Sequence, residues 1–468
     1  MSSKISDSDL ELINLGKSLG LDLVSFADLR SSQEDVFTDE VRNIALKKMD
    51  ANKDNLLSSK DSFYAGSIDF MVSNDPGGKK FFLLETNGGS HRGLSIITEK
   101  QQALLYDGYL EAINQAIKKN KTKSKVFVII GVTSNDGLIH EKVIMLEYFR
   151  KKLKANGHTV KIFNIDNYNK YFEAEIVFLI ADYKQLSKSL SFSDNWVKYK
   201  REKINVLIGD GITRRFKNEN FSKAIKKNFR EINSIIVNPI FNITDDKSLT
   251  YLASYFNKDL LKKYNLKYLL FTKAFSENDL NKKLEYLIKK YEKSFIIKPS
   301  GGSGGAGVMP ISKDENIHDI KNLVKESKKE FFKKFMKKRD PFPYTIQEMA
   351  DFSLIDWWGG KHTFDLRIYL AQKESRVIPI GGLARIAREE FIDRKKLVKQ
   401  EFVVNLSGYN GQIEVGRGIG FSEKSSRLLN LTKEDFANMF CIGCVLFTCI
   451  VKDYYKIINF SDWEKIIE

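Results

Sequence analysis

The sequence predicts an α/β protein of the mixed α+β type, and three observations lead to this prediction. Residues 66–87 combine apolar runs with a turn cluster, which is typical of a strand hairpin. Strand and helix segments alternate between residues 126 and 208, as in a small parallel sheet covered by helices. Strand-like segments then frame a glycine-rich stretch and return after residue 344.

The first sixty residues are predicted to be helical, with Thr38 as a helix cap, and a hairpin follows them. Side chains alternate along a strand, so Glu85 and Asn87 share one face, and hairpin pairing can bring Asp69 beside them. Such oxygen ligands suit Mg²⁺. The alternative is a hairpin whose acids face solvent. The apolar run 81–84 indicates a strand buried on both faces, which argues against that alternative.

A helix is predicted over 98–118, followed by a basic linker at 119–125. Strands at 126–130, 159–163, 176–180 and 204–208 then build the parallel sheet, with a helix over 141–155. The loop 131–137 lies where such sheets bind ligands, at the carboxyl end of a strand. Because it has few glycines, this loop alone is weak evidence for a site.

The stretch 295–308 is an apolar strand that passes through Lys298 into five glycines within seven residues. Glycine backbone can converge on an anion, and a lysine adds positive charge, so this stretch is predicted to hold phosphate. A strand-like segment follows instead of the helix that a dinucleotide-binding loop requires. The glycines of this stretch are also not followed by the Gly-Lys-Ser/Thr of a P-loop, and the His-Arg-Asp and Asp-Phe-Gly motifs of a protein kinase do not follow later. The alternative is a flexible turn without chemistry.

Lysine-rich helices are predicted over 316–339, and strands over 344–349, 362–371, 377–387 and 401–406. Asp365 and Arg367 alternate on one of these strands and therefore share a face. The last segment, 432–467, is predicted to be helical.

Length and composition describe a folded protein. At 468 residues and 42% hydrophobic content the chain is long enough for about three domains. The amino end lacks an apolar signal segment, and the longest apolar run, Met439–Val451, is shorter than the ~18 residues of a membrane span. We therefore expect a cytoplasmic protein without a membrane partner. The sequence does not determine the oligomeric state, and a homodimer is compatible with it.

The formal net charge is +16, with lysines densest at 117–125 and 321–339. These runs lack the interleaved aromatic residues of a single-strand nucleic-acid surface, so no nucleic-acid partner is predicted. The lysines are either solvated helix faces or the source of a field that attracts an anionic substrate, such as a nucleotide or an acidic peptide.

Three cysteines, Cys441, Cys444 and Cys449, lie in the apolar run near the carboxyl end. A Cys-x-x-Cys pair can bind metal or carry redox chemistry, but no second pair or nearby histidine completes such a site. Buried helix packing is therefore the preferred interpretation.

Taken together, these segments resemble the ATP-grasp superfamily of carboxylate–amine ligases. Members run from an Asp-Lys helix start to a Lys-Pro strand with its glycine loop, then to a Gln-Glu hinge and an Asp-x-Arg strand, and end with metal ligands. Here these parts stand at Asp246-Lys247, Lys298-Pro299, Gln347-Glu348 and Asp365-Leu366-Arg367, whereas the metal-type residues lie near the amino end. This order is similar to the circularly permuted group that includes eukaryotic glutathione synthetase and glutathionylspermidine synthetase.

The resemblance implies an ATP-grasp fold with circularly permuted order and an inserted small parallel α/β domain of the pre-ATP-grasp type. Its implied domains are 1–120, with the metal-binding hairpin, 121–240 for substrate, 241–432 with the glycine-rich loop, and terminal helices at 433–468. It also implies an ATP-dependent ligase that joins a small-molecule or peptide carboxylate to an amine through an acylphosphate. ATP and Mg²⁺ would be its cofactors.

Residue roles follow from the same resemblance. The nucleotide would contact Lys247, Lys298, Ser300, Gly301, Gly302, Ser303, Gly304, Gly305, Gly307, Gln347, Glu348 and Met349, with main-chain bonds from 347–349 to adenine and Asp356 at the ribose. Asp69, Glu85 and Asn87 would bind Mg²⁺. Arg367 and Arg385 would hold the γ-phosphate and the substrate carboxylate, while Arg92 and Asn405 would contact substrate.

Each role has a simpler alternative. Lys247 could be a surface charge at a helix start, Asp365 and Arg367 could pair across a sheet, and Asn405 could satisfy strand-end backbone groups. The glutathione enzymes carry an arginine shortly before Asp69 and an acid after Lys-Pro, and both are missing here, which weakens glutathione as a product. Two further functions stay open: a kinase for a polyanionic alcohol such as an inositol phosphate, and a nucleotide-binding scaffold without catalysis.

Overall fold

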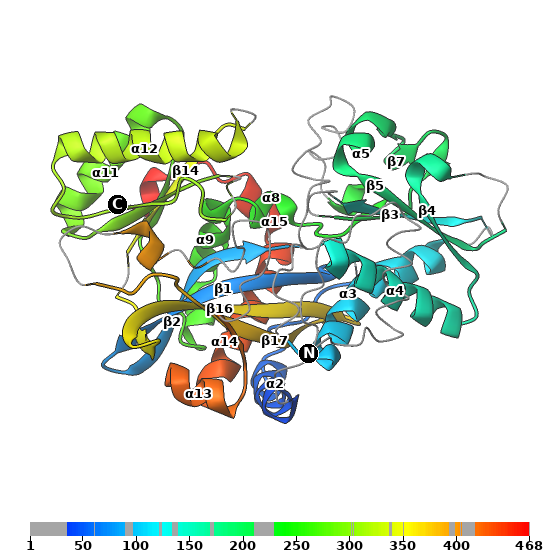
Figure 1. Cartoon of the computed structure of the whole chain (residues 1–468), viewed down its shortest axis with the longest axis horizontal. Coiled ribbons are helices and arrows are strands. Elements are labelled where there is room, and N and C mark those ends of the chain that lie inside the picture. The colour runs from blue at the N-terminus through cyan, green and yellow to red at the C-terminus, as the bar shows by residue number, and fades with distance from the viewer. Residues whose placement is uncertain are drawn as a thin grey trace, which may run out of the picture.

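In the part of the chain that the structure describes, three larger sheets and a small three-stranded one form the fold (Figure 1). The computed structural model describes residues 35–59, 61–88, 97–120, 124–132, 139–168, 173–209, 229–300, 302, 304–336, 339–349, 351–392, 398–402, 404 and 417–467. Within them the mixed α/β fold class expected from the sequence is confirmed.

The central sheet is antiparallel and has the order β18-β17-β16-β1-β2, with β15 paired to β16. Its strands are β1 (Ala65–Asp75), β2 (Gly78–Asn87), β15 (Leu354–Trp357), β16 (Gly360–Lys373), β17 (Arg376–Ile386) and β18 (Gly418–Gly420). The hairpin β1–β2 thus pairs with a strand nearly 300 positions later in the chain, because Asp69 lies opposite Arg367. Figure 1 shows β1 and β16 running side by side through the middle of the molecule.

Helices pack on one face of this sheet. They are α2 (Asp35–Asp50), α8 (Phe241–Thr244), α9 (Lys247–Phe256), α10 (Lys258–Lys262), α13 (Glu423–Leu429), α14 (Lys433–Lys452) and α15 (Tyr454–Ile458), and most contribute to one apolar core with Ile68, Phe70, Leu366 and Ile368. The apolar helix α14 packs closely on the sheet, since a Cβ on Gly443 would lie 3.1 Å from the Cγ2 of Ile68.

Helix α14 also explains the apolar run near the carboxyl end. By length and composition it could cross a membrane, but 89% of its most apolar window is buried inside the protein. Its three cysteines are buried and free, and burial raises the pKa of the Cys441 and Cys449 thiols to about 12. This agrees with the prediction that they serve packing.

The parallel sheet predicted for the second quarter of the chain is present, with the order β10-β9-β3-β5-β4. Its strands are β3 (Val126–Val132), β4 (Val160–Asn164), β5 (Ile176–Asp182), β9 (Val206–Ile208) and β10 (Ile235–Ile236). Helices α3 (Glu99–Lys119), α4 (Ile139–Ala155) and α5 (Tyr183–Ser189) pack around it, with the small meander β6 (Leu190–Ser193), β7 (Trp196–Tyr199) and β8 (Glu202–Lys203). Helix α3 also packs on β16, so it joins this sheet to the central one.

The glycine-rich stretch belongs to a four-stranded antiparallel sheet with the order β11-β14-β12-β13. Its strands are β11 (Phe271–Ala274), β12 (Phe295–Pro299), β13 (Met309–Ile311) and β14 (Tyr344–Glu348), and helices α11 (Glu277–Tyr291) and α12 (Ile317–Phe335) share its core. The loop therefore joins two strands, as predicted.

One predicted strand was wrong at its start. Lys399–Glu401 forms a short 3-10 helix (η4), and the hydroxyl of Thr363 on β16 donates to the carbonyl of Glu401 at 2.5 Å. This tertiary contact outweighs the β-propensity of the apolar residues that follow Glu401. The proposed domain boundaries stay predictions.

Candidate active site

Acidic and basic side chains gather on the face of the central sheet opposite to α14. Asp69 on β1 lies directly opposite Glu85 on β2 and Arg367 on β16, and Asp365 lies opposite Arg385 on β17. Directly opposed residues in antiparallel strands share a face. The sequence prediction that Asp69 and Glu85 meet is therefore confirmed.

The two arginines and two aspartates form one buried network. Arg367 donates from Nε and Nη2 to the two oxygens of Asp69, at 2.8 and 2.7 Å. Arg385 donates in the same two-pronged manner to Asp365, at 2.7 and 2.6 Å, and its Nη2 also reaches Asp69 at 2.7 Å. Such paired contacts are the strongest that a guanidinium makes.

Asp69 therefore pairs with the two arginines, so its carboxylate is not available as the metal ligand that was predicted. Only 1% of the residue is exposed, and both carboxylate oxygens accept hydrogen bonds from arginines. Burial alone would raise the pKa of Asp69, but Arg367 and Arg385 together lower it well below its usual range. For Asp365 burial has the larger effect and raises its pKa to about 6, against the opposing pull of Arg385. The predicted metal site then depends on Glu85 and Asn87.

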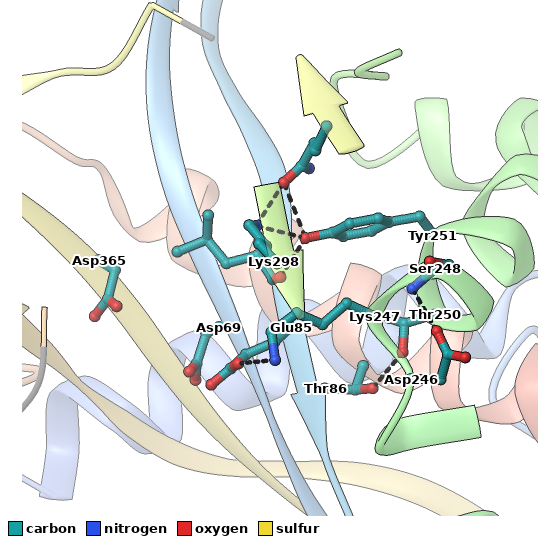
Figure 2. A network of polar contacts seen from close by, with 12 residues as sticks. Asp69, Glu85, Thr86, Asp246, Lys247, Ser248, Thr250, Tyr251, Lys298 and Asp365 are labelled. Carbon is teal, nitrogen blue, oxygen red and sulfur yellow. Dashed lines mark hydrogen bonds and ion pairs between the residues drawn. The ribbon is translucent and has the colours of Figure 1, made fainter. Parts of the chain in front are cut away.

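Lys247 connects this network to helix α9. Its ammonium lies 3.2 Å from a carboxylate oxygen of Glu85 (Figure 2). Asp246 caps the helix by accepting from the Ser248 amide at 2.9 Å, and it also pairs with Lys273 at 2.6 Å, which fixes the first turn. Lys247 is thus directed into the site, which supports the functional interpretation over that of a surface charge.

Lys298 lies at the end of β12, buried and surrounded by neutral partners. It donates to the Tyr251 hydroxyl at 2.8 Å and to the Gln347 side-chain oxygen at 2.6 Å (Figure 2). In the described part of the chain it forms no ion pair with a carboxylate. Burial, and after it the nearby charge of Lys247, lower the pKa of Lys298 to about 7, although Glu85 opposes both effects.

The same network ties three elements to β2. Tyr251 of α9 donates to the carbonyl of Leu84, and the Gln347 amide of β14 donates to the carbonyl of Leu83 at 3.1 Å. The glycine-loop strand and the acidic hairpin therefore meet, as a shared ATP and Mg²⁺ site requires.

Hydrogen bonds with helix α12 and with residues 341–343 fix parts of the glycine-rich loop. Gly304, Gly305 and Gly307 have positive φ angles of 59°, 70° and 73°, which only glycine adopts easily. The Gly307 amide donates to Glu330 of α12 at 3.1 Å. The Ser300 amide donates to the carbonyls of Pro341 and Pro343, so this predicted phosphate donor is already committed.

The hinge on β14 differs from its predicted role. The amides of Glu348 and Met349 donate to the carbonyls of Leu270 and Ser294, at 2.7 and 2.9 Å. These main-chain donors cannot also bind adenine, because β14 lies between two strands. The side chain of Gln347 instead supports Lys298. Asp356 pairs with Lys361 on its own hairpin and has 81% of its side chain exposed, so nothing directs it to a ribose.

Four predicted residues, Gly301, Ser303, Arg92 and Asn405, lie outside the described residues. Gly302 is described at the start of the loop, where a Cβ would lie 3.3 Å from the Pro299 carbonyl.

Sequence reasoning missed two features of the site. Tyr251 was not singled out, although it follows Lys247 by four positions on one helix and therefore shares its face. The second feature is an apolar cluster next to the acids, which combines Met71, Phe82 and Leu269 with the partly buried Leu84 and Phe352. These five side chains come from three distant segments, so no local pattern could have indicated them.

No protein-family model matches the chain, and no curated protein matches its sequence. Among solved structures, a protein of Methylobacillus flagellatus assigned as a gamma-glutamylcysteine synthetase aligns with 90% of this chain and 96% of its own, at 11% identity and a TM-score of 0.48. A glutathione synthetase-like effector of Globodera pallida aligns with 81% of this chain and 82% of its own, at 10% identity and a TM-score of 0.38. D-alanyl-alanine synthetase A of Vibrio cholerae covers 55% of this chain and 74% of its own, at 8% identity and a TM-score of 0.28. At such TM-scores the functional case depends on the site residues.

Proposed function

We propose that this protein is an ATP-dependent ligase that joins a carboxylate to an amine. ATP would phosphorylate the acid to an acylphosphate, and the amine would then displace phosphate to give an amide. The observation that carries the proposal is the meeting of Lys247, Lys298 and Glu85, which brings cations from two distant segments to the acidic hairpin.

The burial and the neutral hydrogen-bond partners of Lys298 support the binding of a nucleotide. A cation that is only 5% exposed and bonded to two neutral groups is costly to keep charged, and a phosphate would supply the missing negative charge. Lys247 would contact the same phosphates and give up Glu85 to a metal. The apolar cluster of Met71, Phe82, Leu84, Leu269 and Phe352 offers a surface of suitable chemistry for the adenine ring.

The fit to Mg²⁺ is supported by Glu85 and Asn87, whose carboxylate and amide oxygens lie two positions apart on one strand face. No group of three acidic, histidine or cysteine side chains suited to a metal occurs among the described residues. Mg²⁺ commonly takes one or two protein ligands and completes its shell with phosphate and water, so this set is sufficient. Bound there, the ion would neutralise phosphate charge.

Arg367 and Arg385 would stabilise the transferred phosphoryl group and orient the acid. Asp69 and Asp365 bind the Nε and Nη2 edge of each guanidinium, so the Nη1 groups are the ones that would contact ligand. Fixed arginines need no reorganisation when charge develops, which is how such groups accelerate phosphoryl transfer.

The test is to trap the acyl group with hydroxylamine. The protein is incubated with ATP, Mg²⁺, hydroxylamine and single amino acids or short peptides, and hydroxamate and ADP are measured. We expect hydroxamate in amounts equal to ADP, and a loss of at least 100-fold in Glu85→Gln, about the loss of one key electrostatic group. Glu326→Gln on the exposed side of α12 is the matched control. ADP release without an acyl product would contradict the proposal.

The net charge of +16 favours one competing function, the phosphorylation of a polyanionic alcohol. A kinase would yield a phosphoester that is stable to hydroxylamine. Finding that product from an inositol phosphate, with no hydroxamate from any acid, would select the kinase.

A further inference from the structure

Ser67 and Asn87 form a second polar row on the active face of the central sheet. They are direct partners across β1 and β2, and each lies two positions along its strand from Asp69 or Glu85. Two positions along a strand span about 6.7 Å, so the rows are neighbours on one surface. This spacing is within the length of an amino acid.

Both side chains carry a buried polar atom that the fold leaves unused. Among the described residues, the hydroxyl of Ser67 and the Nδ2 group of Asn87 have no hydrogen-bond partner, and Ser67 is fully buried. Buried polar atoms are nearly always paired in folded proteins, because an unpaired one costs stability. Two such atoms facing each other across one strand pair indicate a place for a ligand atom.

The surroundings of this row point to a ligand as well. Asn238 follows β10 of the parallel sheet and packs on Gly88, since a Cβ at Gly88 would lie 1.9 Å from the Oδ1 of Asn238. The row therefore lies beside the carboxyl end of the parallel sheet, which is the edge where such sheets bind ligands.

We propose that Ser67 and Asn87 bind the carbonyl oxygen of the acyl group during amide formation. This inference rests on the proposed ligase function. The Ser67 O–H and the Asn87 Nδ2–H groups are the donors, while the Oδ1 of Asn87 would remain available to hold Mg²⁺. Because both donors are neutral, the subsite takes an uncharged carbonyl oxygen rather than a second permanent anion.

The chemistry explains why donors are needed here. When the amine attacks the acylphosphate, the new C–N bond forms and the carbonyl oxygen gains negative charge. The C–O bond to phosphate then breaks, phosphate leaves with its electron pair, and the nitrogen releases a proton to water. Donors fixed in advance at the position of the oxygen stabilise this charge more than they stabilise the ground state.

The test compares Ser67→Ala with Ser353→Ala. Ser353 is also buried, and its hydroxyl also lacks a partner among the described residues, but its amide donates to the carbonyl of Val72, five positions further along β1 than Ser67. Each variant receives glycine, L-alanine or L-glutamate in turn, with ATP and hydroxylamine, and the binding of a non-hydrolysable ATP analogue is measured separately. Ser67→Ala is expected to lose 10- to 100-fold in hydroxamate rate and to keep its nucleotide affinity within twofold, with Ser353→Ala unchanged in both.

Stability distinguishes a binding role from a structural one, and it needs no substrate. Removing an unused buried hydroxyl should leave the melting temperature of Ser67→Ala equal to or above that of the wild type. A fall of several degrees would mean that the hydroxyl already has a structural task, and would overturn the subsite. A hydroxamate rate equal to that of Ser353→Ala would overturn it too. If the wild type gives no hydroxamate with any acid, the ligase function fails, and the subsite for its acyl group fails with it, whatever the melting temperatures.

Discussion

Lys298 is the residue whose environment makes the sharpest prediction about pH. Its pKa of about 7 means that at pH 8 the free protein holds this amine mostly neutral. Phosphate oxygens favour the charged form, so nucleotide binding at pH 8 should take up close to one proton. Calorimetry in buffers of different ionisation enthalpy measures this uptake, and Lys298→Arg should abolish it, since arginine stays charged.

Equal proton uptake in both proteins would contradict this prediction. The same pKa shift has a consequence for stability in the free protein. Because the folded-state pKa lies below the usual lysine value, the unfolded chain binds the proton more tightly, and stability should rise as pH increases from about 7 toward 10.

For single residues, the sequence predicted which side chains belong to the site better than it predicted which of them pair with one another. Asp69, Glu85, Lys247 and Lys298 could be selected because strand alternation and a glycine-rich loop are local patterns. The engagement of Asp69 by Arg385 could not be, because these residues are 316 positions apart and their pairing depends on strand order in the folded sheet.

At the scale of elements, the glycine-rich loop shows what its residues are needed for. Gly307 has a φ angle of 73°, and a Cβ there would lie 2.9 to 3.1 Å from Pro299, the Ser327 carbonyl and Phe331. Gly307→Ala should therefore suffer backbone strain of about 1–2 kcal/mol and a further ~1–3 kcal/mol from crowding. Urea denaturation measures this loss, and the affinity for a nucleotide analogue should fall with it.

Gly78 is the matched control for this substitution. Its φ angle is 107°, but nothing lies within 4 Å of the position of a Cβ. Gly78→Ala should show the strain alone, without crowding or weaker nucleotide binding. Equal losses of stability in the two variants would show that α12 shifts at little cost to accommodate the added Cβ. Close packing would then not be what fixes the loop.

Elements with a strong local signal were predicted well. The capped helix over Glu99–Lys119 and the apolar helix α14 follow from their periodicity and end residues. The availability of the main-chain donors of β14 could not be judged from the sequence, for a topological reason. The sequence shows that 344–349 is a strand, but only the sheet order shows that neighbours on both sides use its main-chain groups.

At the scale of the whole molecule, the parts of the site follow one another along strand β2. The apolar cluster lies beside Phe82 and Leu84, the ion pair with Lys247 follows at Glu85, and the unused amide follows at Asn87. Figure 1 shows the parallel sheet at the end toward which β2 points. This order places the apolar cluster and Lys247 at one end of the row and the carboxyl end of the parallel sheet at the other. Chain segments that are far apart in the sequence meet there, so periodicity alone could not reveal it.

The contact between Gly88 and Asn238 is where this order can be tested. A Cβ at Gly88 would lie 1.9 to 2.3 Å from the amide atoms of Asn238, so Gly88→Ala cannot be accommodated without moving that side chain. We expect Gly88→Ala to lower the free energy of unfolding by about 1–3 kcal/mol through overpacking. Nucleotide binding should be retained, because Lys298 and Lys247 lie on other elements.

Asn238→Ala removes the obstructing atoms, so the double variant Gly88→Ala/Asn238→Ala should recover most of the stability that Gly88→Ala loses. The four proteins form a cycle, and residues in direct contact commonly show coupling of about 0.5–3 kcal/mol. Urea denaturation of each protein measures it. Additive losses would mean that the parallel sheet does not pack against the end of β2, and a substrate could not then reach both the carboxyl end of that sheet and the row of Ser67 and Asn87.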